Sequence, residues 1–347
     1  MGFKPRDNRP AVDNSEQKEY VPIIPEDGLQ TVQIGLLVDL GNHRRQPKFA
    51  KDQQGNREKD EDGNDKIIWP KADAVEQKVA CYVDLLTQTH DYEGDIGVKN
   101  IRLPLHPMTR GMSDGLNFTT VAPRDANKQY VKGIPWVLAP TSQFYKIAGV
   151  VKDESGKKVS EIIFDANYKN TKLNDINQLL GKPFMFNVDV KTTEKEGKTY
   201  VNTKLKSPVP IMKGMAVPEA LIKAVSVNFE DDDLLEAKEE LGGVAKIDLL
   251  RVADLRKIVL AEDYDGSNMQ KAIQEKFDEG ELIKKAKEIQ EKILETDRDL
   301  VEIRQKFPNG REDAPSGSAP QESAAKAAKP NKPEAPSFAD FDDDIPF

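Results

Sequence analysis

The chain has 347 residues, of which 37% are hydrophobic and 32% charged, and its formal net charge is −9. This length accommodates two modest domains, and the low apolar fraction predicts that part of the chain does not pack into a core. No window holds the roughly 18 to 20 uncharged apolar residues of a membrane span, and Met1–Pro10 contains no apolar signal region. We therefore expect a soluble, cytoplasmic protein without membrane contacts.

Residues that build disulfides and metal centres are scarce. Cys81 is the single cysteine, so no disulfide framework can form within the chain, and its place in an alternating segment predicts a buried, unreactive side chain. His43, His90 and His106 are scattered, without the spacing of a zinc site. We expect neither a metal nor another cofactor.

Charge is distributed unevenly along the chain. Four successive blocks have net charges of −2 (Met1–Asp27), +5 (Gly28–Ala216), −8 (Val217–Gly310) and −4 (Arg311–Phe347). Phosphate attraction depends on the local field rather than on the overall charge. The basic central block is therefore compatible with nucleic-acid binding, and Met1–Asp27 is predicted to be an N-terminal arm.

The block 28–216 has the apolar alternation of β-strands. Five strands are predicted, each with its apolar residues on one parity: Thr31–Leu40, Glu76–Thr87, Lys99–His106, Pro183–Thr192 and Thr199–Ser207. The last two form a β-hairpin. Short helices are predicted at Ser142–Val150 and Leu173–Leu180, and His43–Lys66 is predicted to be an exposed loop or insertion. This element order is that of an OB-fold, so we expect a mainly β OB-fold barrel with insertions.

The segment 217–307 is predicted to be helical, which makes the chain α+β overall. Asp231–Leu241 ends at a Gly-Gly pair typical of a helix C-terminus, and Ile247–Leu260 has a second apolar stripe. Apolar residues then recur at steps of four and three from Leu282 to Phe307, over about three heptads. This seam predicts either a helix packed on its own domain, which we favour, or an intermolecular coiled coil and hence a homo-oligomer.

The final block, 308–347, is predicted to be a disordered linker followed by a docking peptide. Residues 308–336 are rich in Pro, Ala, Ser, Lys and Gly, a composition typical of flexible linkers. A pocket on a partner can accept an aromatic ring while basic residues around it bind carboxylates. The predicted partner-binding residues are Asp342, Asp343, Asp344, Ile345, Pro346 and Phe347.

This tip closely resembles the acidic C-terminal tip of bacterial single-stranded DNA-binding proteins. Leu179–Phe184 and Lys198–Asn202 give residues 28–218 a resemblance to the longer OB-fold single-stranded DNA-binding proteins of bacteriophages. The resemblance implies sequence-independent binding and protection of single-stranded DNA in replication, recombination and repair, in the host bacterial cytoplasm if the chain is phage-encoded. It also implies that the tip recruits replication and recombination proteins such as a polymerase, helicase or primase. The helical segment 217–307 has no counterpart in the ordinary bacterial protein.

Sequence-tolerant binding of a single strand requires cations for phosphates and aromatic faces for bases. We expect DNA contacts from residues on the outward strand parity and in the neighbouring loops. The aromatic candidates are Trp69, Tyr82, Tyr130, Trp136 and Tyr200, and the cationic candidates are Arg44, Arg45, Lys48, Arg102, Lys191, Lys204 and Lys206. Core packing is the alternative for each aromatic residue, and a solvated surface role for each lysine.

Two other functions stay open at this point. Asp84, Asp91 and Asp95 can in principle bind magnesium in a nuclease, but the sequence has no GxxxxGK[ST], GxSxG or HExxH motif, so we expect no enzyme. The second alternative is a recombination mediator or helicase-loading adaptor that binds mainly protein. Binding to oligo-dT with a steep salt dependence distinguishes a strand binder from it.

Overall fold

A computed structural model describes residues 22–50, 56–70, 75–92, 97–105, 120–121, 137–138, 143–152, 155–159, 176–195, 198–308 and 310. The chain divides into two compact units. The first comprises residues 1–45 and 72–301, and the second comprises 46–71 and 302–347. No helix in the described part is both long and apolar enough to cross a membrane.

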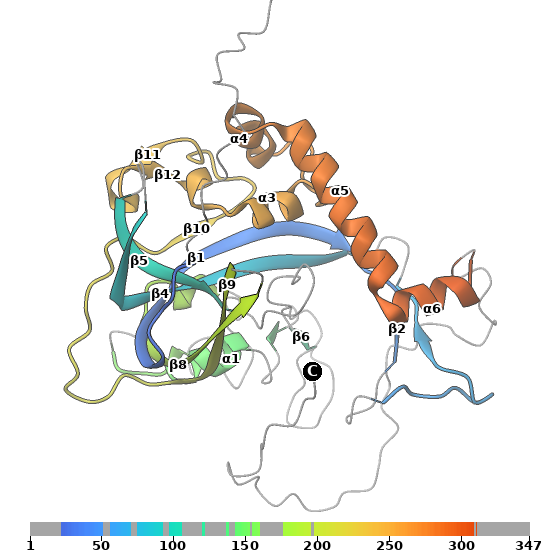
Figure 1. Ribbon diagram of the computed structural model, residues 1–347, viewed down its shortest axis with the longest axis horizontal. Helices are drawn as coiled ribbons and strands as arrows, with labels where there is room; N and C mark the ends of the chain where they lie inside the picture. Colours follow the sequence, from blue (N-terminus) through green and yellow to red (C-terminus); the bar gives the residue numbers. More distant parts are fainter. Residues whose placement is uncertain are drawn as a thin grey trace, which may run out of the picture. The chain divides into compact units, whose positions relative to one another are not determined.

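The first unit contains a six-stranded, mostly antiparallel sheet (Figure 1). Its strands are β1 (Gly28–Arg44), β4 (Val75–Tyr92), β5 (Gly97–Pro104), β8 (Pro183–Lys195), β9 (Lys198–Val209) and the short β10 (Val225–Val227), which pairs with β1 in parallel. Each of the five predicted strands overlaps one of the long ones. The spatial order is β5-β4-β1-β8-β9, and its first four strands have Greek-key order because β8 returns beside β1. Within the described residues no pairing joins β5 to β9, so the sheet is open.

The remaining elements are short strands, 3-10 turns (η) and helices. They are β2 (Lys48–Phe49), β3 (Ile67–Ile68), β6 (Thr120–Val121), β7 (Val137–Leu138), α1 (Gln143–Ala148), η1 (Ile176–Leu179), β11 (Ala237–Lys238), η2 (Glu239–Leu241), β12 (Val244–Ala245), η3 (Lys246–Leu249), α3 (Val252–Ile258), α4 (Asn268–Lys276), α5 (Glu279–Thr296) and α6 (Arg298–Lys306). The helix predicted at Ser142–Val150 is confirmed as α1, whereas the described part of Leu173–Leu180 forms the single turn η1.

The helix predicted at Asp231–Leu241 is wrong. The segment forms turns, β11 and η2, although its predicted end at Gly242 is confirmed by a left-handed φ of 76°. Asp231 and Asp233 form ion pairs with Lys246 at 2.9 and 2.7 Å. Asp231 also accepts a hydrogen bond from the backbone N–H of Asn228. Acidic side chains that bind nearby groups in this way favour turns over helix.

The sheet is buried on both faces over β1 and β4. A first core cluster contains the apolar residues predicted to face inward on β4, β5 and β8, packed with α1. A second cluster lies on the opposite face of β1 and β4 and consists mainly of residues after β9, including those of α3, α4 and α5. Figure 1 shows α3 alongside β1, and the two are in contact. The region after residue 216 therefore completes the sheet's packing.

A β-bulge in β1 divides its side chains between the two clusters. Val32 and Ile34 belong to the first cluster, whereas Leu36 and Val38 belong to the second. The prediction that these residues all share one face is wrong, because the register with β4 shifts between Ile34 and Leu36. A Cβ on the intervening Gly35 would lie 1.8 Å from Oδ2 of Asp84. The glycine thus makes room for a carboxylate at the bulge.

The apolar seam from Leu282 to Phe307 is divided between two helices. The chain leaves helical geometry at Asp297, where ψ is 104°, between α5 and α6. Ala286 is fully buried in the second cluster and Leu282 packs against it. In the N-terminal half of α5, the seam therefore packs on its own unit, which is the alternative that the sequence favours.

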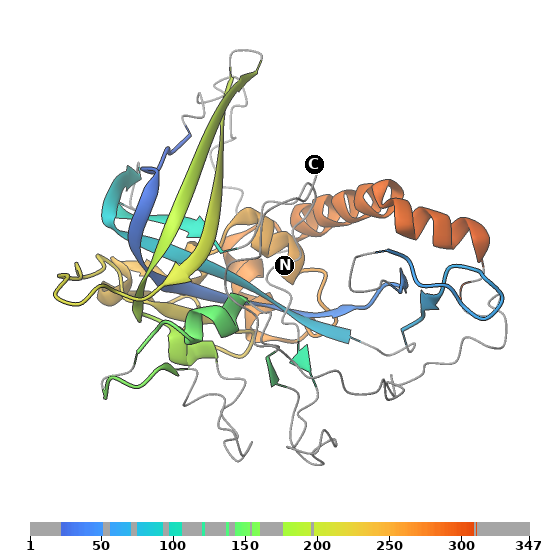
Figure 2. The same cartoon turned by 90° about the horizontal axis from the view of Figure 1, so that it is seen from below.

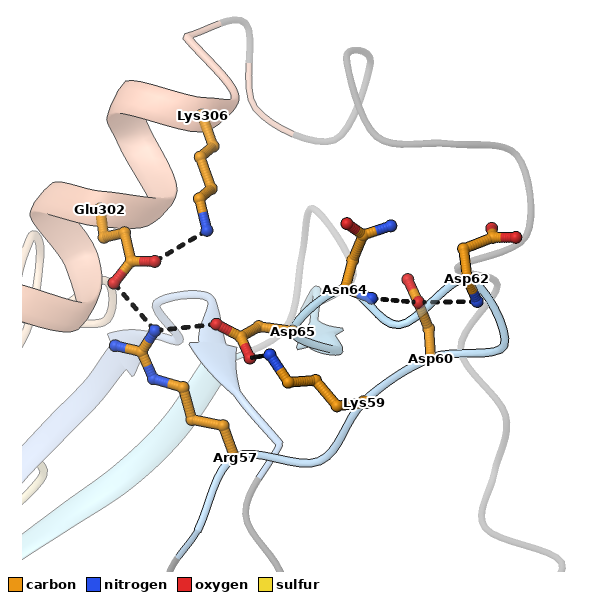
Figure 3. A network of polar contacts seen from close by, with 8 residues as sticks. All are labelled: Arg57, Lys59, Asp60, Asp62, Asn64, Asp65, Glu302 and Lys306. Carbon is orange, nitrogen blue, oxygen red and sulfur yellow. Dashed lines mark hydrogen bonds and ion pairs between the residues drawn. The ribbon is translucent and has the colours of Figure 1, made fainter.

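The second unit is built around Arg57. Strand β2 pairs with β3, and the Arg57 guanidinium forms ion pairs with Asp65 at 3.0 Å and Glu302 at 2.8 Å (Figure 3). It also lies 3.7 Å from the ring centroid of Phe49. The prediction of an exposed loop from His43 to Lys66 is confirmed for most of its described residues, which are exposed. It is wrong at its start, where β1 continues to Arg44, and at β2, where Phe49 is buried.

Candidate nucleic-acid interface

The β8–β9 hairpin presents two faces of different chemistry. Its antiparallel register runs from Met185 opposite Val209 to Lys195 opposite Lys198. The inner face contributes Phe184, Phe186 and Val188 to the first core cluster, with Leu205 packed against it. Because side chains alternate along a strand, the residues between these positions project from the outer face. Figure 2 shows the paired strands extending as a long arm from the sheet.

The outer face of this hairpin combines cations with one aromatic ring. Tyr200 is 54% exposed and lies opposite Thr193. We call the following set the hairpin face: Asp189, Lys191, Thr193, Lys195, Tyr200, Asn202, Lys204 and Lys206. All of its lysines are exposed, so this face offers both groups that a single strand requires.

The hairpin face is electropositive. Among its described residues the single carboxylate is Asp189, which pairs with Lys206 at 3.7 Å. Both side chains are substantially exposed, at 30% and 48%, and exposed ion pairs contribute about 0–1 kcal/mol. A phosphate can replace this partner at little cost. The structure brings together four predicted residues here: Lys191, Tyr200, Lys204 and Lys206. Lys195 was missed, although it has the same strand parity as Lys191.

Tyr82 is not on an exposed surface, and the expectation that it projects outward for stacking is wrong. It is 3% exposed, its hydroxyl donates a hydrogen bond to Asp254, and the guanidinium of Arg251 lies 4.5 Å from its ring centroid. Burial raises the pKa of the Tyr82 hydroxyl and of the Asp254 carboxyl. The outward face of β4 is covered by α3, which contributes Asp254.

Arg102 is also unavailable as an exposed phosphate ligand. Its Nε and Nη2 donate to the two oxygens of Asp84 at 2.6 and 3.0 Å, and its side chain is 17% exposed. Asp84 is 2% exposed. Since this carboxylate is buried and already bound, it makes a poor magnesium ligand for the nuclease alternative. Asp91 is exposed, and Asp95 lies outside the described residues.

The other predicted DNA contacts lie elsewhere. Arg44 is the last residue of β1 and Arg45 follows it; both are exposed, and Arg44 pairs with Glu262 at 2.9 Å. Lys48 and Trp69 belong to the second unit; Lys48 is exposed, and Trp69 packs edge-on against Phe307 at 5.7 Å. Residues outside the described part of the chain are Tyr130, Trp136 and the predicted partner-binding residues Asp342–Phe347.

Neither a metal centre nor a reactive thiol is found at the interface. The described residues contain no group of three or more His, Cys, Asp or Glu side chains that could hold a metal ion. Cys81 is fully buried, as predicted, and burial raises the pKa of its thiol. The side chains of the hairpin face offer charge attraction, hydrogen bonding and ring stacking.

Comparison with models of protein families, with curated protein sequences and with solved structures found no match. The fold and the site define the class instead. The protein is a mixed α+β protein with an open, mostly antiparallel sheet, from which a hairpin with a cationic and aromatic outer face extends.

Proposed function

We propose that this protein binds single-stranded DNA without sequence preference and that the hairpin face contacts the strand. The observation that supports this most strongly is the grouping of four exposed lysines with the 54%-exposed ring of Tyr200. Lysines attract phosphates of any sequence, and stacking of one base on an aromatic ring contributes roughly 1–3 kcal/mol.

The strand order supports an OB-fold for this sheet. An OB-fold is a five-stranded, partly open Greek-key barrel, and it binds oligonucleotides through the face of its second and third strands and through the connections after its first and fourth strands. Here the long strands have Greek-key order, and α1 lies between the third and fourth of them in sequence. The β8–β9 hairpin corresponds to the connection after the fourth strand.

The covered face of β4 explains why we assign DNA to the hairpin. In an OB-fold the outer face of the second and third strands can hold the oligonucleotide, but here Tyr82 and Asp84 on that face are buried. The exposed alternative on the same sheet is the hairpin face. Its contacts are thus proposed for Lys191, Lys195, Tyr200, Lys204 and Lys206.

The acidic tip adds a second part to the proposal. Residues Asp342–Phe347 resemble the tip of bacterial single-stranded DNA-binding proteins, and an acidic, aromatic peptide suits a basic pocket on a partner. We propose that the tip recruits replication and recombination proteins to the strand that the hairpin face holds. The protein would then act in DNA replication, recombination and repair.

Salt-dependent binding to oligo-dT tests the proposal. Labelled oligo-dT is titrated with the full chain between 50 and 500 mM salt, and the affinity is measured by fluorescence anisotropy. A single strand releases about 0.7 counterion per phosphate contact, so four lysines predict a slope near −3 in log affinity against log salt. Absent binding, or binding that does not depend on salt, would contradict the proposal and favour a protein-binding adaptor.

A further inference from the structure

A cavity of about 270 Å³ lies within the first unit, away from the hairpin face. The sheet contributes Asp84, Lys99 and Arg102 to its walls, and the region after β9 contributes Ile222, Asp248 and Arg251 among others. One water molecule occupies about 30 Å³ in the liquid. The cavity therefore has room for a small ligand that carries polar atoms.

The Lys99 side chain is largely buried, and its ammonium group lies at the cavity wall without a carboxylate of a described residue bound to it. Its side chain is 8% exposed, and it forms no hydrogen bond or ion pair with any described residue. Its Nζ lies 3.7 Å from the position that a Cβ on Gly242 would occupy, which places it under the cover formed by η2. An ammonium group at a cavity wall with no carboxylate bound to it favours a ligand that supplies negative charge.

The carboxylates around Lys99 already have partners. Asp84 is bound by Arg102 through both oxygens, and both oxygens of Asp248 accept from Lys276 at 2.8 Å. Burial and then repulsion by Arg102 lower the pKa of Lys99, while Asp248 acts in the opposite direction. The net effect of the protein's own groups is thus to disfavour the ammonium ion that a bound anion would stabilise.

Arg251 supplies a second cation to the cavity wall. Its Nη2 donates to the backbone carbonyl of Arg102 at 3.2 Å, and its guanidinium is held over the ring of Tyr82. It forms no salt bridge with a described residue. Neither cation has a salt bridge with a described residue, although Asp248 attracts Lys99 and Arg251 attracts Asp254 over a longer distance. One doubly charged anion can bind both cations, and guanidinium geometry suits phosphate oxygens.

We propose that this cavity binds a phosphate group, with Lys99 as its counter-charge and Arg251 as its second ligand. Apolar wall residues such as Ile222 and Leu249 then face whatever carries the phosphate. Inorganic phosphate and the terminal phosphate of a nucleotide share this chemistry. The site goes beyond the proposed function, because none of its residues belongs to the hairpin face.

Calorimetric titration of the full chain with inorganic phosphate, in phosphate-free buffer at constant ionic strength, tests this site. We expect one phosphate per chain. Lys99→Met is expected to weaken binding by ten- to a hundredfold, the loss typical of a charged hydrogen bond. Lys223→Met is the matched control, because this lysine lies in the same covering region but is 67% exposed and paired with Glu240; it should leave the phosphate affinity unchanged.

Two further measurements make the result decisive. Thermal unfolding should show phosphate raising the melting temperature of the wild type but not of Lys99→Met. Tighter binding of 5′-phosphorylated than of 5′-hydroxyl dinucleotide would assign the site to a nucleotide, and equal binding would assign it to free phosphate. Undetectable phosphate binding, or equal binding by Lys99→Met, overturns the site. Failure of oligo-dT binding alone would contradict the proposed function instead.

Discussion

Two parts of one sheet have the same alternating sequence pattern but differ in how many of their faces are buried. Strands β1 and β4 bury both of their faces, whereas the β8–β9 hairpin buries one and exposes the other. Tyr82 and Tyr200 show the difference most clearly: both occupy the parity opposite the first core, yet they are 3% and 54% exposed. On β4 and β8, alternation therefore identifies which side chains enter the first core but not whether the other face is covered.

The largest effect is expected from removing the region that covers β1 and β4. A chain ending at Pro218 exposes side chains such as Leu36, Val38 and Leu40, whose burial contributes about 1.5–3 kcal/mol each. Their sum approaches a typical total stability of 5–15 kcal/mol, so we expect no cooperative unfolding transition by circular dichroism. A chain ending at Gly310 keeps every described residue and should unfold cooperatively. A cooperative transition in the shorter chain would show that residues after Pro218 are not needed to stabilise the sheet.

The next largest effect concerns the buried ion pair beneath the cover. Arg102→Leu leaves Asp84 buried without its partner, which should cost about 3–5 kcal/mol in the free energy of unfolding. Arg44→Leu breaks the exposed pair with Glu262, whose side chains are 69% and 41% exposed, and should cost about 0–1 kcal/mol. Urea denaturation measures both. Equal losses would show that the face of β4 is not covered.

The two tyrosines should separate stability from binding. Tyr82→Phe leaves the buried Asp254 without its hydroxyl donor and should lower the free energy of unfolding by about 1–3 kcal/mol, with oligo-dT affinity unchanged. Tyr200→Ala should weaken oligo-dT binding by about 1–3 kcal/mol, with the melting temperature unchanged. Thermal unfolding and anisotropy titration of both variants check this. If both variants lowered only stability, or both lowered only oligo-dT affinity, the distinction between a buried Tyr82 and a DNA-binding Tyr200 would be contradicted.

The smallest effect is expected from two partly buried carboxylates in the second unit, Asp65 and Glu302. Hydrogen bonds from Lys59 and Arg57 lower the pKa of Asp65 from 3.8, and those from Lys306 and Arg57 lower the pKa of Glu302 from 4.5. Because both folded-state values lie below the ordinary ones, their contribution to stability is present above pH 4.5 and is lost as the pH falls through the lowered values. The fluorescence of Trp69, which packs on Phe307, should report this loss. In Arg57→Met the pH dependence should be reduced.

The strands could be predicted from sequence because their apolar periodicity is local. Val79, Cys81 and Val83 face the first core as expected, and so do Phe184 and Phe186 on β8. Such alternation records which side chains must avoid water, whatever the rest of the chain does.

Neither the bulge in β1 nor the burial of the second face of β1 and β4 by residues after β9 could be predicted, because both depend on residues distant in sequence. Predicting the bulge at Gly35 requires knowing that the carboxylate of Asp84 lies beside it. Predicting that Tyr82 is buried requires knowing its contact with Asp254, which is 172 residues away in sequence. For the candidate site, parity identified Lys191, Tyr200, Lys204 and Lys206. The same reasoning failed for Tyr82 and Arg102, because residues after β9 pack against the face on which these two side chains lie.

The central claim is that the hairpin face, rather than positive charge in general, holds the strand. It is tested most directly by replacing Lys191, Lys204 and Lys206 together with Gln and measuring oligo-dT affinity across a salt series. The matched control replaces three exposed lysines of α4 and α5, Lys271, Lys284 and Lys287, with Gln. We predict that the hairpin variant binds more weakly at low salt, with a slope of log affinity against log salt shallower by about 2, and that the control changes neither quantity. Equal losses in the two variants, or no loss in the hairpin variant, would contradict the account.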